Sequence, residues 1–319
     1  MVFIRLLNLT TSCLLQLAAG IQSYTFLGQE AQPIAVDPAS CLEAVIVEPR
    51  KLRTIATALE SAALSNNADF DLLTIAVGDE NGEYVKQLVQ NSSVLLKLRM
   101  QGLLRFRKLP FRDLGGNSFD GTNRTANPRG HHDQYSRVLM SAEFWEGFTC
   151  NRILLMQSDT VLCSNSNVKL SDYFKYEYVG GRTHNLDKKY FPGRRHLNGG
   201  LSFRNRLGML RCIKSLASYP DDVRLWLDQL PEDGFFSNCK ELEQPSGPVL
   251  RRFAIASGSF EMEPDQVPFG VHSPWQESSC KGCSKSNLQH CVGAIKLLQD
   301  TNPRRARKIM KSLKLGKWR

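Results

Sequence analysis

The chain has 319 residues, of which 42% are hydrophobic and 23% charged, a balance typical of a folded globular protein and not of a disordered one. Its formal charge is +10, but eight of its cations lie after Asp300, where no acidic residue occurs. Subtracting these eight from +10 leaves +2 for the rest of the chain, which argues against a nucleic-acid-binding core and assigns the basic character to the C-terminal segment.

Residues 1–23 have the pattern of a secretory signal peptide or a weak signal-anchor. Arg5 supplies the positive start, Leu6–Leu17 forms a modest apolar centre, and Ala18–Gly20 contains the small residues at which such signals are cleaved. The centre is too short and too polar for a comfortable membrane span. We therefore expect a chain of the secretory pathway, in the Golgi lumen or secreted. A mitochondrial transit segment is the alternative, which the single Arg disfavours.

Strands and helices alternate through the first half of the folded body. The predicted strands are Leu42–Val47, Asp71–Val77, Arg105–Leu109 and Ile153–Met156. Apolar residues at helical spacing predict helices over Leu52–Leu64, Tyr84–Val89 and Gln134–Phe148. This alternation predicts an α/β fold with a doubly wound, mostly parallel sheet. The dinucleotide fingerprint, the phosphate loop and the serine-hydrolase elbow do not occur, which disfavours a nicotinamide-dependent dehydrogenase in particular.

A polar segment, Gly115–Asp133, precedes the last of these helices. It ends in His131, His132 and Asp133, a combination of residue types that metal sites use. Adjacent side chains diverge, however, so we expect a solvated loop here. Asp133 then has an ordinary structural task, as the cap of the helix that follows.

A carboxylate, Asp159, follows the fourth predicted strand within the polar step Gln157–Thr160. Ligands of open α/β sheets bind at the carboxyl ends of the strands, so Asp159 is a candidate ligand-binding residue. The residues alone leave a second interpretation equally open, in which Asp159 only caps a turn.

Three later positions combine residue types that chemistry uses with features that also occur for structural reasons: Asn198–Gly200, Glu232–Asp233 and His272. Paired glycines before a strand let a ligand approach the backbone, and they also form ordinary turns. Two acids after Pro231 suit a helix start with or without catalysis. A single His in an apolar segment is more often structural than a ligand.

Nine cysteines favour an oxidising compartment in which some of them pair. The Cys-rich segment 276–300 contains four potential zinc ligands: Cys280, Cys283, His290 and Cys291. Because His290 and Cys291 are adjacent, their spacing differs from that of zinc modules, so disulfides are favoured over zinc. Sequons at Asn91 and Asn123 agree with a lumenal glycoprotein.

The basic tail, residues 301–319, leaves two interpretations open. Leu313, Leu315 and Trp318 are interspersed among its cations, a composition that suits contact with an acidic membrane surface or a polyanion. Its apolar periodicity is weak, which favours a solvated, disordered tail instead.

The order of these features resembles the core of the GT-A glycosyltransferases. Six motifs resemble more closely an uncharacterised glycosyltransferase-like domain family, a domain of unknown function related to the GT-A superfamily. They are E-P-R at Glu48–Arg50, A-E-F-W at Ala142–Trp145, Q-S-D-T-V-L-C at 157–163, N-G-G-L-S-F-R at 198–204, P-E-D-G-F-F-S-N-C at 231–239 and P-F-G-V-H-S-P-W at 268–275. The resemblance covers Leu42–Trp275 and implies a GT-A-like domain, a mostly parallel twisted sheet flanked by helices.

The resemblance also implies a metal site. The Asp-x-Asp element of the GT-A core, which holds a divalent ion on the donor diphosphate, matches Gln157–Asp159. The late His that often completes that site matches His272. Gln157 replaces the first Asp, so a single carboxylate, that of Asp159, remains. Oxygen ligands suit Mg²⁺ or Mn²⁺, and an added imidazole favours Mn²⁺.

A nucleotide-sugar donor is implied beside the glycine pair, where the N-G-G motif matches the glycine-rich segment of the GT-A core. The residues expected at the donor are Glu48, Arg50, Arg137, Asn198, Gly199 and Gly200. A departing diphosphate needs positive charge near it, and Arg50, Arg137 and Arg204 are available to supply that charge.

The implied activity is transfer of a sugar from this donor, with UDP the expected carrier, to a carbohydrate or glycoconjugate acceptor. Asp233 matches the acid that acts as base in inverting members, with Glu232 beside it, and its place at a helix start keeps its pKa low. The alternative, motivated by Gln157, is a non-catalytic relative that binds sugar or nucleotide. No nucleic-acid partner is expected.

Overall fold

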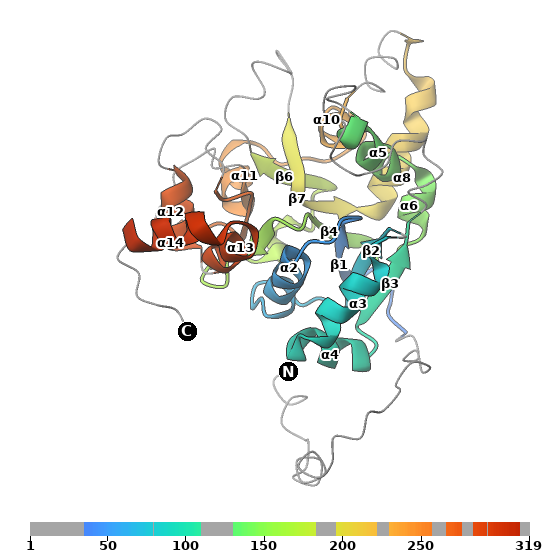
Figure 1. The fold of residues 1–319 in the computed structure, drawn as a ribbon. Coiled ribbons are helices and arrows are strands. Elements are labelled where there is room, and N and C mark those ends of the chain that lie inside the picture. The colour runs from blue at the N-terminus through green and yellow to red at the C-terminus, as the bar shows by residue number, and fades with distance from the viewer. Residues whose placement is uncertain are drawn as a thin grey trace. The chain divides into compact units, whose positions relative to one another are not determined.

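The computed structural model of the protein describes residues 35–78, 80–109, 130–182, 196–221, 230–256, 266–275, 283–291 and 293–312 (Figure 1). All of them belong to one compact unit, Pro33–Arg319. The predicted features that lie outside the described residues are the leader 1–23, residues 115–129 of the polar segment with the sequon at Asn123, Cys280 and the end of the tail, 313–319.

Nine strands of the described residues form one sheet, in the order β3-β2-β1-β4-β7-β6-β8-β9-β5. They are β1 (Leu42–Val47), β2 (Leu72–Val77), β3 (Leu104–Lys108), β4 (Arg152–Met156), β5 (Thr160–Leu162), β6 (Tyr178–Arg182), β7 (Leu197–Asn205), β8 (Ala254–Ala256) and β9 (Gly270–His272). Strand β7 runs antiparallel to both β4 and β6, and β5 runs antiparallel to β9. The other five pairings are parallel, which confirms the predicted α/β fold with a mostly parallel sheet.

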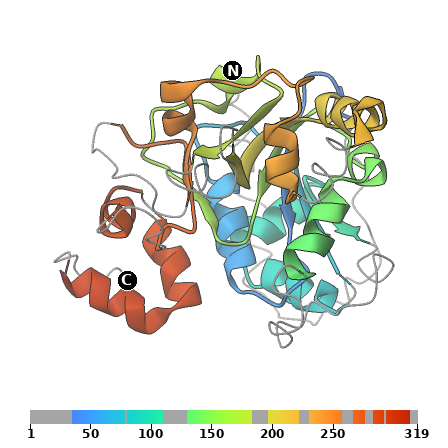
Figure 2. The same ribbon diagram turned by 90° about the horizontal axis from the view of Figure 1, so that it is seen from above.

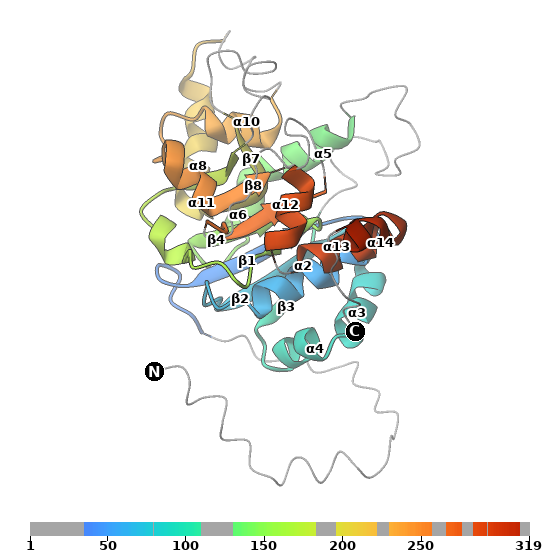
Figure 3. The same ribbon diagram turned by 90° about the vertical axis from the view of Figure 1, so that its left-hand side faces the viewer.

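The crossovers between the first four strands place helices on both faces of the sheet. The chain moves outward from β1 to β3 through α2 (Thr54–Ala63), α3 (Gly82–Gln90) and α4 (Ser93–Met100), then returns past β1 to β4 through α5 (Gly130–Leu139) and α6 (Ala142–Glu146). Because such crossovers are right-handed, the outward and the returning helices cover opposite faces (Figure 3). All residues of β1 and β2 are buried, as expected for strands covered on both sides.

Shorter elements complete the domain after β5. They are the 3-10 helices η1 (Leu170–Tyr173) and η2 (Leu216–Ser218) and the helices α8 (Arg206–Ser215), α10 (Glu232–Ser237) and α11 (Gly247–Phe253). Helix α10 packs on β7 and on α5, and α11 packs on β6 and β8. Strands β6, β7 and β8 are therefore covered by α10 and α11, and of these two helices α11 was not predicted.

The predicted helix Gln134–Phe148 is two helices, because Ser141 starts a new one. Ser141 has an extended backbone, and its hydroxyl oxygen accepts a hydrogen bond from Phe144 N at 3.3 Å, which is the N-cap geometry of α6. Trp145 Nε1 donates to Leu139 O at 2.7 Å and so satisfies a carbonyl group at the end of α5. A short polar residue that bonds to the local backbone thus outweighs the apolar periodicity.

Two other element boundaries differ from the prediction. Helix α5 begins at Gly130, so Asp133 lies inside this helix and is not its cap. The glycine pair, Gly199–Gly200, lies inside β7 instead of before it. The register between β6 and β7 shifts beside these glycines, an irregularity of the kind that is common next to functional sites.

Three further helices, α12 (Cys283–His290), α13 (Ala294–Thr301) and α14 (Pro303–Ser312), follow the sheet and lie beside one another (Figure 2). They share a second hydrophobic cluster with β5 and β9, to which Leu297, Leu298 and Ala306 contribute. Of the expected solvated or disordered tail, the disorder is therefore wrong for 303–312, whereas most residues of this stretch are exposed. No helix in the described ranges is long and apolar enough to cross a membrane.

Among the described residues, six cysteines form three disulfides: Cys41–Cys150, Cys163–Cys291 and Cys212–Cys239. The predicted disulfides are thereby confirmed. Because Cys291 is bonded to Cys163, the four-ligand zinc alternative is wrong. Three disulfides agree with a secreted or lumenal protein, since such bonds are rare in reducing compartments.

Removal of the Cys41–Cys150 disulfide is expected to lower the free energy of unfolding. The bond joins residues 109 positions apart in the sequence, and native bridges that close long loops contribute about 2–5 kcal/mol. Urea unfolding of Cys41→Ala/Cys150→Ala under non-reducing conditions measures the loss. Wild-type protein in reductant, in which all three bonds open, should lose at least as much. An unchanged free energy of unfolding in both experiments would contradict the pairing.

Candidate functional site

An acid and an imidazole meet where β5 pairs with β9. Asp159 lies in the turn between β4 and β5, and His272 is the last residue of β9. Because Thr160 pairs with His272 in the antiparallel ladder, Asp159 Oδ1 lies 3.2 Å from His272 Nε2. Ser273 donates its hydroxyl to the other carboxylate oxygen and its N–H to Asp159 O at 2.9 Å. Ser273 has a φ of 46°, a left-handed conformation that is unfavourable for residues other than glycine and is often found at functional sites.

The two groups shift each other's pKa toward a charged pair. Burial alone raises the pKa of Asp159, but the charge of His272 and the hydrogen bonds from His272 and Ser273 outweigh it and hold this pKa at about 2. Burial alone lowers the pKa of His272, and the charge and hydrogen bond of Asp159 raise it above its usual value. The pairing therefore stabilises the ionised carboxylate of Asp159 and the protonated form of His272, and His272 would have to release that proton to bind a metal ion.

The glycine pair of β7 lies between this ion pair and a second group of acids. A Cβ on Gly200 would lie 2.5 Å from His272 Nε2, and a Cβ on Gly199 would collide with the carboxylate of Glu232. Asn198 Oδ1 accepts a hydrogen bond from Gly200 N at 2.9 Å, so the carboxamide lies against the same backbone. Side chains from both groups can approach this strand closely because it carries none of its own here.

Asp233, in the first turn of α10, is held by three donors. His196 Nε2 lies 3.2 Å from Asp233 Oδ2, which also accepts from Gly199 N at 3.3 Å, and Oδ1 accepts from Gly234 N at 2.8 Å. Burial alone raises the pKa of Asp233, but these hydrogen bonds and the His196 ring lower it below its usual value. The charge of Asp233 in turn helps to raise the pKa of His272, so the two groups share one electrostatic environment.

His196 was not predicted as a site residue. Its sequence signal is weak, since it precedes Asn198 by two residues and nothing else distinguishes it. The imidazole is buried, and it reaches Asp233 across 37 residues of chain only because α10 packs on β7.

Glu232 and Arg204 form an ion pair in the interior of the domain. Arg204 Nη1 donates to Glu232 Oε2 at 2.7 Å, and Ser136 Oγ accepts from Glu232 N at 3.1 Å. Burial raises the pKa of Glu232, and the adjacent Arg204 charge limits that rise. The guanidinium also lies over three aromatic rings, those of Trp145, Tyr178 and Phe236.

This pair corrects one prediction. Arg204 is completely buried, with 0% of its side chain exposed, so the expectation that it is available to a diphosphate is wrong. Residue type and motif do not distinguish an exposed arginine from one enclosed by aromatic rings, because the rings come from α6, β6 and α10. The carboxylate of Glu232 accepts a hydrogen bond from Arg204, and its backbone N–H donates one to Ser136, so both groups of Glu232 are used within the fold.

Glu48 and Arg50, the two charged residues of the E-P-R motif, form an ion pair at the carboxyl end of β1. Arg50 donates from Nε to Glu48 Oε1 at 2.7 Å and from Nη2 to Oε2 at 2.8 Å, and these bonds raise the pKa of Arg50. Ser158 donates to Glu48 Oε2 at 2.6 Å, which links the motif to the turn that carries Asp159. Glu48 is buried, whereas 57% of the Arg50 side chain is exposed, so Arg50 retains an accessible positive face.

Helix α5 presents Tyr135 to the interior instead of Arg137. Residues two positions apart on a helix point about 200° apart, so Tyr135 and Arg137 face opposite ways. The Arg137 side chain is exposed. Ser136, between them, accepts a hydrogen bond from Glu232 N of α10. The hydroxyl of Tyr135 is buried, and this burial raises its pKa, while an interaction with the Gln157 side chain lowers it in part. An aromatic residue at helical spacing is typical of a hydrophobic core, so the buried hydroxyl oxygen of Tyr135 could not be predicted from the sequence.

The donor set at the end of β4 suits a metal ion that a phosphate helps to hold. The described residues contain no group of three or more His, Cys, Asp or Glu arranged for a metal, so Asp159 and His272 stand as two potential ligands. Mg²⁺ and related ions are commonly bound by one or two protein groups together with substrate phosphates and water. A carboxylate and an imidazole therefore fit an ion shared with a diphosphate, and not a preassembled metal cage.

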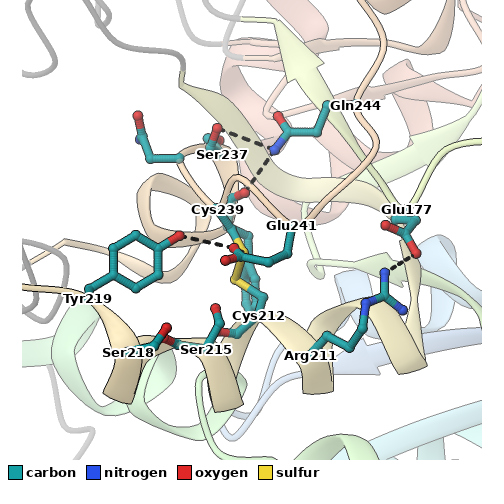
Figure 4. The surroundings of a disulfide bond; sticks show 12 residues. Glu177, Arg211, Cys212, Ser215, Ser218, Tyr219, Ser237, Cys239, Glu241 and Gln244 are labelled. Carbon is teal, nitrogen blue, oxygen red and sulfur yellow. Dashed lines mark hydrogen bonds and ion pairs between the residues drawn. A yellow bond between two sulfur atoms is a disulfide. The ribbon is translucent and has the colours of Figure 1, made fainter.

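A disulfide holds the other end of α10 (Figure 4). Cys239, two residues after α10, is bonded to Cys212 of α8, and Gln244 Nε2 donates to Ser237 O at 3.3 Å. The loop Ser237–Gln244 lines a cavity of about 380 Å³, at the end of α10 opposite to Asp233. This loop contains no predicted site residue, and its contacts anchor the helix that carries Asp233.

The family described as "Protein of unknown function (DUF5672)" matches residues 123–272. The predicted resemblance to a domain of unknown function is confirmed. The match contains the Asp159 turn, the glycine pair and the Glu232–Asp233 helix start, and it ends at His272. The Glu48–Arg50 motif lies outside it. No functionally curated protein matches the chain in sequence.

Several solved glycosyltransferases are similar to the chain in structure. The galactosyltransferase LgtC, crystallised with donor and acceptor sugar analogues, has a TM-score of 0.49 and 14% identity over 84% of this chain and 99% of LgtC. Mouse xyloside xylosyltransferase 1 has a TM-score of 0.45 and 12% identity over 73% and 97% of the two chains. The glycosyltransferase GlyE of Streptococcus pneumoniae TIGR4 has a TM-score of 0.45 and 13% identity over 85% of this chain and 64% of GlyE. Similarity at this level assigns no donor, acceptor, metal or mechanism.

Substitution of Gly200 by Ala is expected to destabilise the domain. The new Cβ would lie 2.5 Å from the His272 ring, and relief of such a clash costs about 1–3 kcal/mol. Gly82→Ala is the matched control, since its nearest neighbour would be Val77 Cγ2 at 3.9 Å and a helical alanine is neutral or favourable. Urea unfolding compares the two variants, and equal free energies of unfolding would contradict the close approach of His272 to the strand.

Asp233→Asn is expected to show a pH-dependent loss of stability. The pKa of Asp233 is lower in the folded protein than the value of about 3.9 in the unfolded chain, so its stabilisation is complete well above that value and disappears as the pH falls through the folded-state pKa. The difference in free energy of unfolding between wild type and variant should therefore be largest near neutral pH and shrink below about pH 4. A difference that is constant across this range would contradict the hydrogen bonding described for Asp233.

Proposed function

We propose that this protein is a metal-assisted glycosyltransferase that transfers a sugar from a nucleotide-sugar donor, with UDP as the carrier, to a carbohydrate or glycoconjugate acceptor. The observation that carries the proposal is the arrangement around Gly199–Gly200. The Asp159–His272 pair lies against one of these glycines, and the start of α10, with Asp233, lies against the other. A reaction between two bound substrates needs such an arrangement, with charge neutralisation and proton removal provided close together.

The donor diphosphate would bind at the carboxyl ends of β1 and β4. Arg50, oriented by Glu48, offers an exposed guanidinium to the phosphate oxygens. Asp159 and His272 would hold Mn²⁺ or Mg²⁺, which neutralises charge on the departing diphosphate. The backbone of Gly199 and Gly200, with the Asn198 carboxamide against it, lets the donor sugar approach closely. Arg137, on the exposed side of α5, is a weaker candidate for this site.

The acceptor would be activated by Asp233. Its lowered pKa keeps the carboxylate ionised at neutral pH, so it can accept the proton of an acceptor hydroxyl as that oxygen attacks the anomeric carbon. The bond to the diphosphate breaks as the new glycosidic bond forms, which inverts the anomeric configuration. His196 would orient the carboxylate, and Glu232 would act through Arg204 as support for α10 instead of touching substrate.

The three disulfides support work in an oxidising compartment, and we propose the Golgi lumen or the cell exterior as the place of action. The exposed Asn91 sequon between α3 and α4 agrees with the same compartment.

Asp233→Asn is expected to lower turnover by about 10²–10⁴-fold while UDP affinity stays within about twofold of wild type, because a general base acts on the acceptor and not on the nucleotide. UDP release from a panel of UDP-sugars with Mn²⁺ measures turnover, and calorimetry measures UDP affinity. Asp172→Asn removes an exposed acid of η1 and is the matched control. Undiminished turnover in Asp233→Asn would rule out the base assignment.

A second candidate function is binding of a sugar or nucleotide without catalysis, and Gln157 in place of an acid favours it. The two candidates differ in their use of metal. The transferase should bind UDP more tightly with Mn²⁺ than without, and Asp159→Asn or His272→Ala should remove that difference. UDP binding that ignores Mn²⁺, together with no donor turnover, would select the binding protein.

A further inference from the structure

Helix α14 divides into an apolar face and a cationic face. Ala306 is buried, Ile309 and Met310 are half-buried, and this face packs on α13 within the cluster that also contains β5 and β9. The opposite face consists of four exposed cations at the spacing i, i+3, i+4 and i+7: Arg304, Arg307, Lys308 and Lys311. Residues at this spacing share one side of a helix, so the four charges form one stripe about 10 Å long. We call it the α14 stripe.

Two links connect helix α14 and the helices before it to the chain segments that carry Asp159 and His272. Arg305 Nη2 donates to Trp275 O at 2.7 Å, and Trp275 follows His272 by three residues, which limits their separation to about 11 Å. The Cys163–Cys291 disulfide joins the residue after β5 to the residue after α12, and β5 begins directly after Asp159. Helix α13 lies beside α2, with α14 next to it (Figures 1 and 3).

The stripe does not serve the stability of its own helix. Like charges at i, i+3 and i, i+4 repel, and cations in the first turn oppose the helix dipole. In the described part of the chain, no carboxylate pairs with any of the four cations, and α14 itself contains no acid. The helix is held instead by its apolar face and by Asn302, whose side-chain oxygen accepts from Arg305 N at 3.0 Å. A row of cations that no described carboxylate compensates, on a firmly packed helix, is suited to an external anion.

We propose that the α14 stripe binds the acceptor, and that this acceptor is an acidic glycan chain bearing carboxylate or sulfate groups. This inference rests on the proposed transferase function, since the links from α14 and α12 to the segments that carry His272 and Asp159 are what make the bound chain an acceptor. Guanidinium groups recognise carboxylate and sulfate oxygens in a planar, paired geometry. A row of charges along one helix face matches a polymer with repeated negative groups better than a single small anion.

The same geometry disfavours a membrane as the partner of α14. A helix that lies on a bilayer buries its apolar face among the lipids. In α14 that face, with Ala306 and Ile309, is already covered by α13 and the surrounding cluster. The exposed side offers charge without apolar side chains, which suits a soluble polyanion.

The test compares three full-length proteins: wild type, a stripe variant and a control variant. The stripe variant is Arg304→Gln/Arg307→Gln/Lys308→Gln/Lys311→Gln, in which glutamine keeps helix propensity close to that of the residues replaced. The control variant is Lys97→Gln/Lys175→Gln/Lys214→Gln/Lys240→Gln, which removes the same charge from exposed positions on other elements. Fluorescence anisotropy with labelled heparin and hyaluronan dodecasaccharides measures affinity, and the two probes distinguish sulfate from carboxylate recognition.

The stripe variant is expected to bind at least one of the two glycans about tenfold or more weakly at physiological salt, with a shallower salt dependence because fewer counterions are released, while the control stays within about twofold. Affinity for UDP with Mn²⁺ should be equal in all three proteins, so a failure of the transferase proposal shows in donor turnover and not in this comparison. Arg304→Lys/Arg307→Lys, which keeps the charge, should retain most of the binding and shows that the helix tolerates substitution.

Three results would overturn the proposal. The first is that wild type binds neither glycan. The second is that stripe and control variants lose equal affinity, which would make the attraction a property of net charge. The third is that the stripe variant keeps glycan binding and loses binding to phosphatidylserine vesicles, which would make α14 a membrane contact.

Discussion

The ion pair between Arg204 and Glu232 is the interaction on which the site depends. A fully buried guanidinium must keep its partner, because breaking a buried pair leaves an uncompensated charge at a cost of about 3–5 kcal/mol. Arg204 belongs to β7 and Glu232 is the first residue of α10, so the pair fixes the start of this helix on the strand. Asp233 is the next residue, and its position against Gly199 follows from that constraint.

Strand β7 organises the remaining charges in the same way. It lies between β4 and β6 and runs antiparallel to both, so its glycine pair meets the end of β4 where Gln157 N donates to Gly200 O at 2.8 Å. The absence of side chains at Gly199 and Gly200 leaves room for His272 on one side and Glu232 on the other. Each charged group of the site therefore has a partner in the fold, and Arg50 keeps an exposed face.

Local sequence patterns predicted the framework well, as particular residues illustrate. Leu42–Val47, in which five of six residues are apolar, is a strand with the predicted bounds, and all six residues are buried as expected for a strand covered on both faces. Asp159 was predicted to follow the fourth strand, and it lies in the turn after β4. The break at Ser141 and the helix α14 were missed, since a single capping hydroxyl and a face of only three apolar residues are weak signals.

By itself, the sequence determined the alternation of strands and helices, the oxidising compartment suggested by nine cysteines, and the residue types that chemistry could use. These properties depend on the composition of the chain or on residues only a few positions apart, so composition and periodicity are sufficient to predict them. Only the tertiary structure decided that Arg204 is enclosed, that His196 faces Asp233 and that α14 is bonded to the segment that follows His272. These relations join residues that are distant along the chain, and strand order, helix packing and disulfides bring them together.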